Sequence, residues 1–374
     1  MPSFTRRGML IAGVGTGAVV VATRGVAAQA RDTRLYAGGY AAEGGAGVQP
    51  LQLTAAGQWR RGVAVPDARD ASFGLDRTAN GRHYLLEEGD EGHLSTWDVA
   101  AGRWQRRSRV STGGASPCHL ALDRTGTALA VANYSSGSVM LLRLDRATGL
   151  PVGEGVVRQH KGSGPNKDRQ ATPHAHWVGF SPDNRWLWSV DLGADAIFAH
   201  AYDAARGTLG ETKMACRLDP GAGPRHMVLH PTLPRAYVVT ELSNSVVTLR
   251  PGSDGTFAVV DRTSTLPVGF GGASYGAAIV IDRAGRHLYV SNRGHDSVAV
   301  FGIDGSGGLT LVQHIACGGH WPRYMRMLDD GRHLLVANQR SGAVAAFAVA
   351  RDGRLAPFGA KAAVPGIAFI GVAG

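Results

Sequence analysis

One short pattern recurs along this chain and restricts it to a repeat architecture. A turn-forming segment is followed by a β-rich run that usually ends on a polar residue, most clearly in Asp123–Asn133 and Asp282–Asn292. Seven copies, one of them truncated, end at positions 39, 88, 133, 191, 240, 292 and 338. Their mean spacing of about 50 residues is typical of repeat proteins, in which one supersecondary unit stacks against the next.

The turns within the pattern indicate that each unit is built from β-hairpins. Asp-x-x-Gly, as in Asp282–Gly285, places a turn former and a residue free to adopt positive φ between two apolar runs. The chain has 53 glycines and only 18% charged residues, which suits many tight turns between buried sheets. We therefore predict an all-β fold, a seven-bladed β-propeller of four-stranded antiparallel blades. The alternative, a two-sheet sandwich, rarely needs seven evenly spaced hairpins.

The two ends of the β-rich chain are predicted to close the ring together. The truncated first copy contains the strand-like run Leu35–Gly38, and the C-terminal segment contains Ile367–Ile370. If these runs share one blade, the sheet edges that an open ring would expose are covered.

The first 30 residues are predicted to be a targeting segment rather than part of the fold. Arg6 and Arg7 resemble a twin-arginine signal, and a moderately apolar run follows at 9–22. That run is too short to cross a hydrocarbon core about 30 Å thick. Cleavage near Ala30 would leave a propeller domain of residues 31–374 in the periplasm or secreted, without stable membrane insertion. An uncleaved membrane anchor is the alternative.

Cysteine usage and charge exclude several other classes of protein. Cys118, Cys216 and Cys317 are widely spaced and form no C-x-x-C pair, so neither a zinc ribbon nor a haem attachment site is indicated. The net charge is +10, but no dense basic run interleaved with aromatic residues is present, which argues against nucleic-acid binding. We expect a monomer that uses no metal or cofactor and binds a small molecule, attracted by a mild positive field if that molecule is an anion.

The predicted blade geometry places a polar site at one mouth of the central channel. Each hairpin turn lies at one end of a blade, so the start of its first strand and the end of its second strand meet at the other. These positions carry chemically active side chains, and the candidates taken from them are His119, His174, His176, Arg225, Arg323, Asn133, Glu241, Asn292 and Arg293. Because all blades share one mouth, these groups should converge on one pocket.

An irregular basic segment, Arg158–Thr172, occupies the longest interval between copies and adds Gln170 to the candidates. Long loops in compact folds are often functional lids. Structural roles remain open for several residues. Asn133, Asn292 and Asn338 can bridge blades by hydrogen bonds, and Glu241 can form a purely structural ion pair with an arginine.

Several motifs at these positions resemble the propeller-type 6-phosphogluconolactonases. They are Gly221–Pro231 followed by Glu241-Leu, Pro173–His176, Asp191–Asp195, Ser291–Asp296 and Ala132–Tyr134. The resemblance covers roughly residues 33–372. The same family includes carboxymuconate-lactonising enzymes, and their proposed site of one His, two Arg and one Glu implies His176, Arg225, Glu241 and Arg293 as the catalytic residues here. We expect His174, Gln170, Asn133, Asn292 and Arg323 to bind substrate beside that set.

The function that this resemblance implies is hydrolysis of a sugar lactone, phosphorylated or not, to the aldonate. Glu241 or His176 would act as general base, and Arg225 and Arg293 would stabilise the oxyanion or hold an anionic group. No Ser or Cys stands in a nucleophile motif such as G-x-S-x-G, so attack by water is expected. Two alternatives remain, a lactone-forming cyclase and a propeller that binds a ligand or protein without catalysis.

Overall fold

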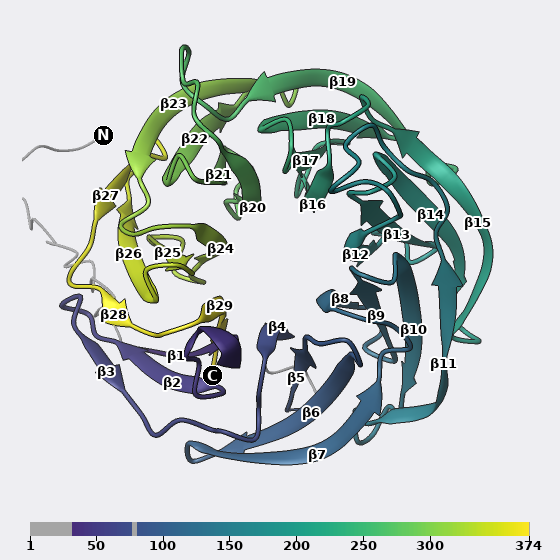
Figure 1. Ribbon diagram of the computed structural model, residues 1–374, viewed down its shortest axis with the longest axis horizontal. Coiled ribbons are helices and arrows are strands. Elements are labelled where there is room, and N and C mark those ends of the chain that lie inside the picture. Colours follow the sequence, from purple (N-terminus) through teal and green to yellow (C-terminus); the bar gives the residue numbers. More distant parts are fainter. Residues whose placement is uncertain (1–31, 77–80, 374) are drawn as a thin grey trace, which may run out of the picture. The chain divides into compact units, whose positions relative to one another are not determined.

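The computed structural model describes residues 32–76 and 81–373, which form seven antiparallel sheets arranged as the blades of a propeller (Figure 1). The predicted all-β, seven-bladed fold is therefore confirmed. The predicted targeting segment 1–30 and part of the turn after Asp76 lie outside the described residues. In the described part of the chain, no helix has the length and apolar character needed to cross a membrane.

The first three blades use the following strands, and a short 3-10 helix follows β1. The first contains β29 (Ile367–Val372), β1 (Thr33–Gly39), β2 (Gln49–Leu53) and β3 (Trp59–Arg61), with the 3-10 helix η1 at Ala41–Glu43. The second contains β4 (Ala71–Leu75), β5 (Arg82–Glu87), β6 (His93–Ala100) and β7 (Arg103–Ser111). The third contains β8 (Pro117–Leu122), β9 (Ala128–Asn133), β10 (Ser138–Leu144) and β11 (Pro151–Gln159).

The remaining four blades follow the chain in order. The fourth contains β12 (Ala175–Phe180), β13 (Trp186–Asp191), β14 (Ala196–Asp203) and β15 (Thr208–Arg217). The fifth contains β16 (Pro224–Leu229), β17 (Ala236–Thr240), β18 (Ser245–Pro251) and β19 (Phe257–Ser264). The sixth contains β20 (Tyr275–Ile281), β21 (His287–Arg293), β22 (Ser297–Ile303) and β23 (Leu309–Ala316). The seventh contains β24 (Pro322–Met327), β25 (His333–Asn338), β26 (Ala343–Val349) and β27 (Leu355–Pro357), and β28 (Ala362–Ala363) pairs with β26.

The ring closes as the sequence predicts. Strand β1 pairs with β29, with Leu35 opposite Val372 and Ala37 opposite Ile370. One blade is thus assembled from both ends of the described chain, so opening the ring would expose paired strand edges to water.

Hydrogen bonds from aromatic side chains at one repeated position connect adjacent blades. The hydroxyls of Tyr84, Tyr237 and Tyr289 donate to glycine carbonyls in the outer hairpin turns of the following blades, at 2.6, 2.9 and 3.1 Å. Trp188 Nε1 makes the equivalent bond, at 2.8 Å. These residues belong to the second strands of their blades, and their rings are buried, so each satisfies its polar atom inside the apolar interface.

The inner strands β4, β8, β12, β16, β20, β24 and β29 surround the channel (Figure 1). Each has an irregularity in register close to one end. In β16, for example, Pro224 pairs with Thr240 and His226 with Val239, which leaves Arg225 without an opposite residue. A β-bulge of this kind turns a side chain away from the regular alternation, and bulges often lie beside active sites.

Candidate active site

The channel mouth is built from three sets of equivalent residues; the first two have one residue per blade, and the third has a residue in six of the seven blades. Members of the first set directly follow the second strand and donate their backbone N–H to the residue before the inner strand, except Arg293, which is the last residue of β21. The first set comprises Tyr40, Glu88, Tyr134, Leu192, Glu241, Arg293 and Gln339. The second set occupies the bulges and comprises Ala368, Ser72, Cys118, His176, Arg225, Ala277 and Arg323. The third set directly follows the bulges in six blades and is aromatic: Phe369, Phe73, His119, Trp177, His226 and Tyr324.

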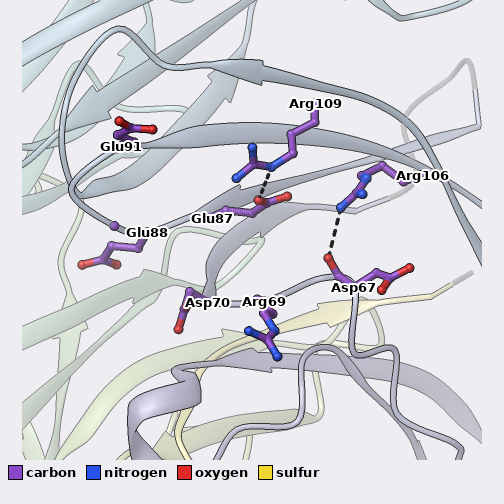
Figure 2. A pocket seen from close by; sticks show the side chains of 9 residues that line it. Asp67, Arg69, Asp70, Glu87, Glu88, Glu91, Arg106 and Arg109 are labelled. Carbon is purple, nitrogen blue, oxygen red and sulfur yellow. Dashed lines mark hydrogen bonds and ion pairs between the residues drawn. The ribbon is translucent and has the colours of Figure 1, made fainter.

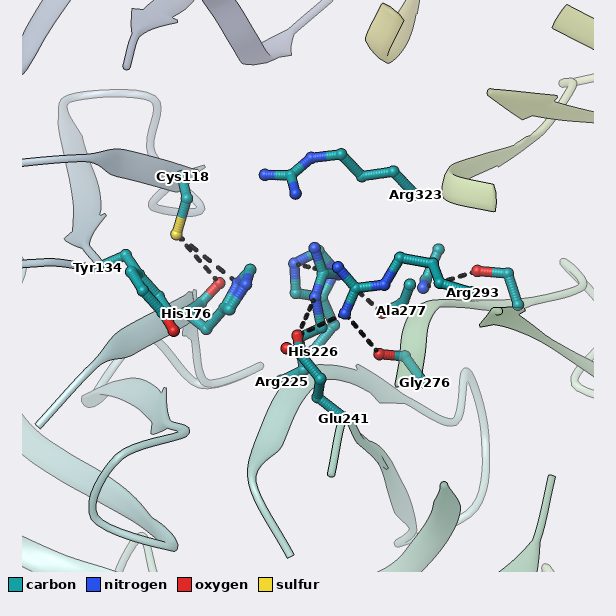
Figure 3. A network of polar contacts seen from close by, with 12 residues as sticks. Cys118, Tyr134, His176, Arg225, His226, Glu241, Gly276, Ala277, Arg293 and Arg323 are labelled. Carbon is teal, nitrogen blue, oxygen red and sulfur yellow. Dashed lines mark hydrogen bonds and ion pairs between the residues drawn. The ribbon is translucent and has the colours of Figure 1, made fainter. Parts of the chain in front are cut away.

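Glu241 is the centre of a buried ion-pair cluster (Figure 3). Its Oε2 atom lies 2.7 Å from Nη2 of Arg293 and 3.2 Å from Nε of Arg225. Its Oε1 atom lies 2.5 Å from Nη2 of Arg169. The two buried arginines also donate to the backbone of β20, Arg225 to Ala277 at 2.7 Å and Arg293 to Gly276 at 3.3 Å. The carboxylate therefore holds guanidinium groups from two blades and one loop in a fixed array.

The protonation states in this cluster follow from burial and from the neighbouring charges. Burial opposes ionisation of Glu241, but the charges of Arg293 and Arg225 outweigh it and hold the pKa of the carboxyl well below its usual range. Burial, together with the charges of Arg293 and Arg323, lowers the pKa of Arg225 to about 9. At neutral pH the cluster thus contains one carboxylate and fully protonated guanidinium groups.

His176 lies beside this cluster at the bulge of β12. Its Nδ1 atom is 3.6 Å from Cys118 Sγ, and its ring meets those of Tyr134 and His226 edge-on, with centroids 5.3 and 5.2 Å apart. Burial, and then the charge of Arg225, holds the pKa of His176 well below its usual value. The imidazole is therefore neutral at physiological pH.

The aromatic set closes the channel below these charges. His119 contacts Phe73, Trp177 and His226, with ring centroids 4.4, 5.6 and 5.2 Å apart. These four rings also line a cavity of about 370 Å³, whose other lining residues belong to the inner strands and are mainly apolar. The charged groups therefore face a mouth with an apolar floor, which strengthens their electrostatic interactions relative to bulk water.

A second carboxylate–arginine arrangement lies on another wall of the mouth. Glu88 Oε2 accepts a hydrogen bond from the Tyr40 hydroxyl at 2.8 Å and lies 3.8 Å from Nη2 of Arg323. Glu88 also borders a pocket of about 460 Å³ (Figure 2), whose charged lining is Asp67, Arg69, Asp70, Glu87, Glu91, Arg106 and Arg109.

The structure brings His176, Arg225, Glu241 and Arg293 together, and it places Arg323 in the same mouth. His174 is adjacent, since its ring stacks on Tyr134 with centroids 4.5 Å apart. Three further predicted residues are not brought into the cluster, and their carboxamides bond to the backbone. Asn133 donates to Thr112 O and Asn292 to Thr265 O, each at 2.9 Å, and Gln170 donates to Leu192 O at 2.9 Å.

Sequence reasoning missed Arg169, Tyr40 and Glu88. Arg169 belongs to the irregular basic segment that the sequence flagged as a lid, but no motif singled out this residue among its neighbours. Glu88 stands in the structure where Glu241 stands in its own blade, but the sequence copies end at 88 and 240, so that alignment is offset by one residue and hid the equivalence. Among the described residues, no group of three or more His, Cys, Asp or Glu is arranged to hold a metal ion.

Comparison with known proteins gives a consistent result. Residues 34–372 match the family described as "Lactonase, 7-bladed beta-propeller". A protein of Bacillus subtilis named 6-phosphogluconolactonase is 37% identical over 247 residues, which cover 64% of this chain and 69% of that protein. The solved structure of the periplasmic gluconolactonase of Pseudomonas aeruginosa superimposes with a TM-score of 0.84 at 27% identity, covering 92% and 99% of the two chains. A putative 6-phosphogluconolactonase from Bacteroides fragilis has a TM-score of 0.82 at 25% identity, covering 91% and 97%.

Proposed function

This chain belongs to the lactonase family of seven-bladed β-propellers, and we propose that it is a carboxylic ester hydrolase that opens a sugar lactone to the aldonate with water. One observation carries the proposal. His176, Arg225, Glu241 and Arg293, contributed by three blades, surround one buried position at the channel mouth. A neutral base and two guanidinium donors are what hydrolysis of an ester by water requires.

The charge of the mouth favours an anionic substrate or product. Four arginines (169, 225, 293 and 323) face two glutamates (88 and 241), so the sum of their charges is +4 − 2 = +2. The aldonate product carries a carboxylate, and guanidinium groups bind carboxylate and phosphate through paired hydrogen bonds. This excess positive charge argues against a mouth designed for a neutral or apolar partner.

In the proposed mechanism, the lactone carbonyl lies against the guanidinium groups of Arg225 and Arg293. A water oxygen attacks the carbonyl carbon, and its proton passes to the imidazole of His176. The two arginines stabilise the negative charge that develops on the carbonyl oxygen. The bond from that carbon to the ring oxygen then breaks, and the imidazolium returns the proton to the leaving alkoxide. The product acid ionises to the aldonate and releases one proton to solvent.

Glu241 fits a positioning role better than the role of base. A carboxylate shared by three guanidinium groups has little affinity for a proton, which its lowered pKa reflects. Its charge keeps Arg225 and Arg293 at fixed positions, so the oxyanion site is organised before the substrate binds. The sequence left the choice between Glu241 and His176 open, and a lowered pKa does not separate them, because the pKa of His176 is lowered as well. We assign the base to His176 because both carboxylate oxygens of Glu241 are engaged by guanidinium groups.

Export of the enzyme is part of the same proposal. The twin-arginine pattern at Arg6 and Arg7 predicts it, and one structural neighbour is a periplasmic gluconolactonase. A periplasmic location favours a lactone that occurs outside the cytoplasm over a phosphorylated intermediate of central metabolism.

The proposal is tested by following proton release during hydrolysis of a panel of lactones by purified protein. We expect turnover of gluconolactone, 6-phosphogluconolactone or a related sugar lactone above the spontaneous rate. Ring closure of muconate-like diacids, assayed in parallel, tests the cyclase alternative. If no lactone is hydrolysed and no diacid is closed, the binding propeller becomes the better description.

A further inference from the structure

The wall formed by Tyr40, Glu88 and Arg323 repeats the Glu241 cluster in a looser form. Arg323 occupies the bulge of its blade, as Arg225 does, and Glu88 follows the end of its second strand, as Glu241 does. The mouth therefore contains two carboxylate–guanidinium arrangements contributed by different blades. Only the first is accounted for by the proposed chemistry.

The two arrangements differ in how their arginines are satisfied. Arg225 and Arg293 lie within 3.2 Å of Glu241 and also donate to backbone carbonyls. Arg323 lies 3.8 Å from Glu88, beyond hydrogen-bonding distance. Within the described residues, the guanidinium of Arg323 has no hydrogen-bond acceptor, whereas the Tyr40 hydroxyl takes up one oxygen of Glu88 at 2.8 Å.

The position of Arg323 is nevertheless well defined. Its guanidinium carbon lies 5.3 Å from the centroid of the Tyr40 ring, and only 18% of its side-chain surface is exposed. In Figure 3 the guanidinium of Arg323 points towards the side of the network that holds Cys118 and His176. The charge of Arg323 contributes to lowering the pKa of both Arg225 and Arg293, so its guanidinium lies close enough to interact with the Glu241 cluster. The donors of this guanidinium are not used within the described residues, so they remain available to an anion that enters the mouth.

We infer that Arg323 is the anion subsite of the lactone pocket, and that it binds a phosphate or carboxylate at the end of the substrate remote from the ester. This assignment rests on the proposed lactone hydrolysis. Tyr40 positions the guanidinium through its ring and restrains Glu88 through its hydroxyl. Both anion types are recognised by the same planar fork of donors.

Glu88 makes the inference specific, because it opposes the anion that Arg323 attracts. Arg323→Gln removes the positive charge and its donors, so binding of an anionic group should weaken. Glu88→Gln removes the nearby negative charge while keeping the shape, so binding of the same group should strengthen. Opposite effects from two neighbouring substitutions are not expected if the pair only holds blades together.

The first experiment measures kcat/KM for three lactones: gluconolactone, 6-phosphogluconolactone and the monolactone of glucaric acid, which has a free carboxylate. For Arg323→Gln we expect the preference for each anionic lactone over gluconolactone to fall by about 10- to 100-fold. Arg323→Lys should retain part of the preference for anionic lactones. Arg351→Gln, an exposed charge removal in the same blade, is the matched control and should keep the wild-type ratios. If the preference falls only for the phosphorylated lactone, the subsite binds phosphate. If it falls only for the glucarate lactone, the subsite binds carboxylate.

The second experiment measures product binding by calorimetry and does not depend on turnover. We expect Arg323→Gln to weaken, and Glu88→Gln to tighten, the binding of 6-phosphogluconate or glucarate relative to gluconate. Equal changes for all three products, or weaker binding in both variants, would overturn the inference. A wild type that binds these anions through Arg323 but hydrolyses no lactone would instead refute the proposed function and leave the subsite standing.

Discussion

Glu241 Oε2 lies 2.7 Å from Nη2 of Arg293, and this ion pair joins the end of the second strand of one blade to the same position of the next. Both side chains are buried, so the charges interact in a medium of low polarity. A buried pair is weak evidence for stability but is costly to break from one side. The geometry therefore makes Glu241 the residue on which the positions of Arg225 and Arg293 depend.

Glu241→Gln should lower kcat/KM by at least 100-fold, since it leaves Arg225 and Arg293 without a counter-charge. It should also destabilise the fold by about 3–5 kcal/mol, the usual cost of breaking a buried pair. Steady-state kinetics and thermal unfolding check the two effects.

Because Glu241 has a depressed pKa, its contribution to stability is present above the pKa of the unfolded chain, near 4.3, and is lost as pH falls towards the pKa of the folded state. In the variant, that part of the acid sensitivity should disappear. Wild-type activity in a folded variant would exclude the positioning role.

The buried histidines of the mouth should make the protein less stable in mild acid. Burial, with nearby charges, lowers the pKa of His176 and His226 well below its usual value and that of His119 to about 3. The unfolded chain binds protons on these rings below about pH 6.5, whereas the folded chain does not, so stability falls as pH decreases through that value. The loss is on the order of 2 kcal/mol per ring between pH 6.5 and 5. Thermal melts across this range should show a smaller decline for His119→Gln than for the exposed control His320→Gln.

Arg225→Lys should reduce kcat/KM by roughly 10- to 100-fold without unfolding the protein. Lysine keeps the charge opposite Glu241 but lacks the planar fork that also donates to Ala277 O at 2.7 Å. Hydrolysis rates and circular dichroism of the variant provide the check. The matched control is Arg283→Lys in the exposed turn before β21, which should behave as wild type. A loss of the same size in the control would point to a general effect of the substitution.

Cys118→Ala should retain activity within about fivefold, although its sulfur lies 3.6 Å from His176 Nδ1. Burial, and then the charge of Glu88, raises the pKa of the thiol, so little of the reactive thiolate is present. Rates of the variant and mass spectrometry of wild type quenched during turnover address this point. An acyl adduct on Cys118, or an inactive but folded Ala variant, would replace water attack by covalent catalysis.

Replacing Arg6 and Arg7 by Lys should retain the precursor in the cytoplasm, because the twin-arginine route depends on this pair. Fractionation of cells that express the two forms measures the distribution. Unchanged delivery to the periplasm would indicate the general secretion route or a segment that has been misread.

The sequence by itself determined the architecture. Seven copies of one turn-and-strand pattern specify seven hairpins. These signals are local, because turn residues and strand periodicity act over a few positions. The same register placed Arg225, Glu241 and Arg293 at one mouth, since Pro224 pairs with Thr240 and Tyr275 with Arg293.

Only the tertiary structure decided which of the polar residues at that mouth meet. The bulges that turn His176 and Arg225 inwards depend on pairing between strands, and the bond from Arg169 to Glu241 joins residues 72 positions apart. Asn133 and Asn292 stand at equally polar strand ends, yet their carboxamides donate to the backbone carbonyls of Thr112 and Thr265. A side chain at a strand end either points into the channel mouth or bonds to the backbone that leads into its blade. Which of the two occurs depends on the closure and radius of the whole ring, a long-range property that local sequence patterns do not encode.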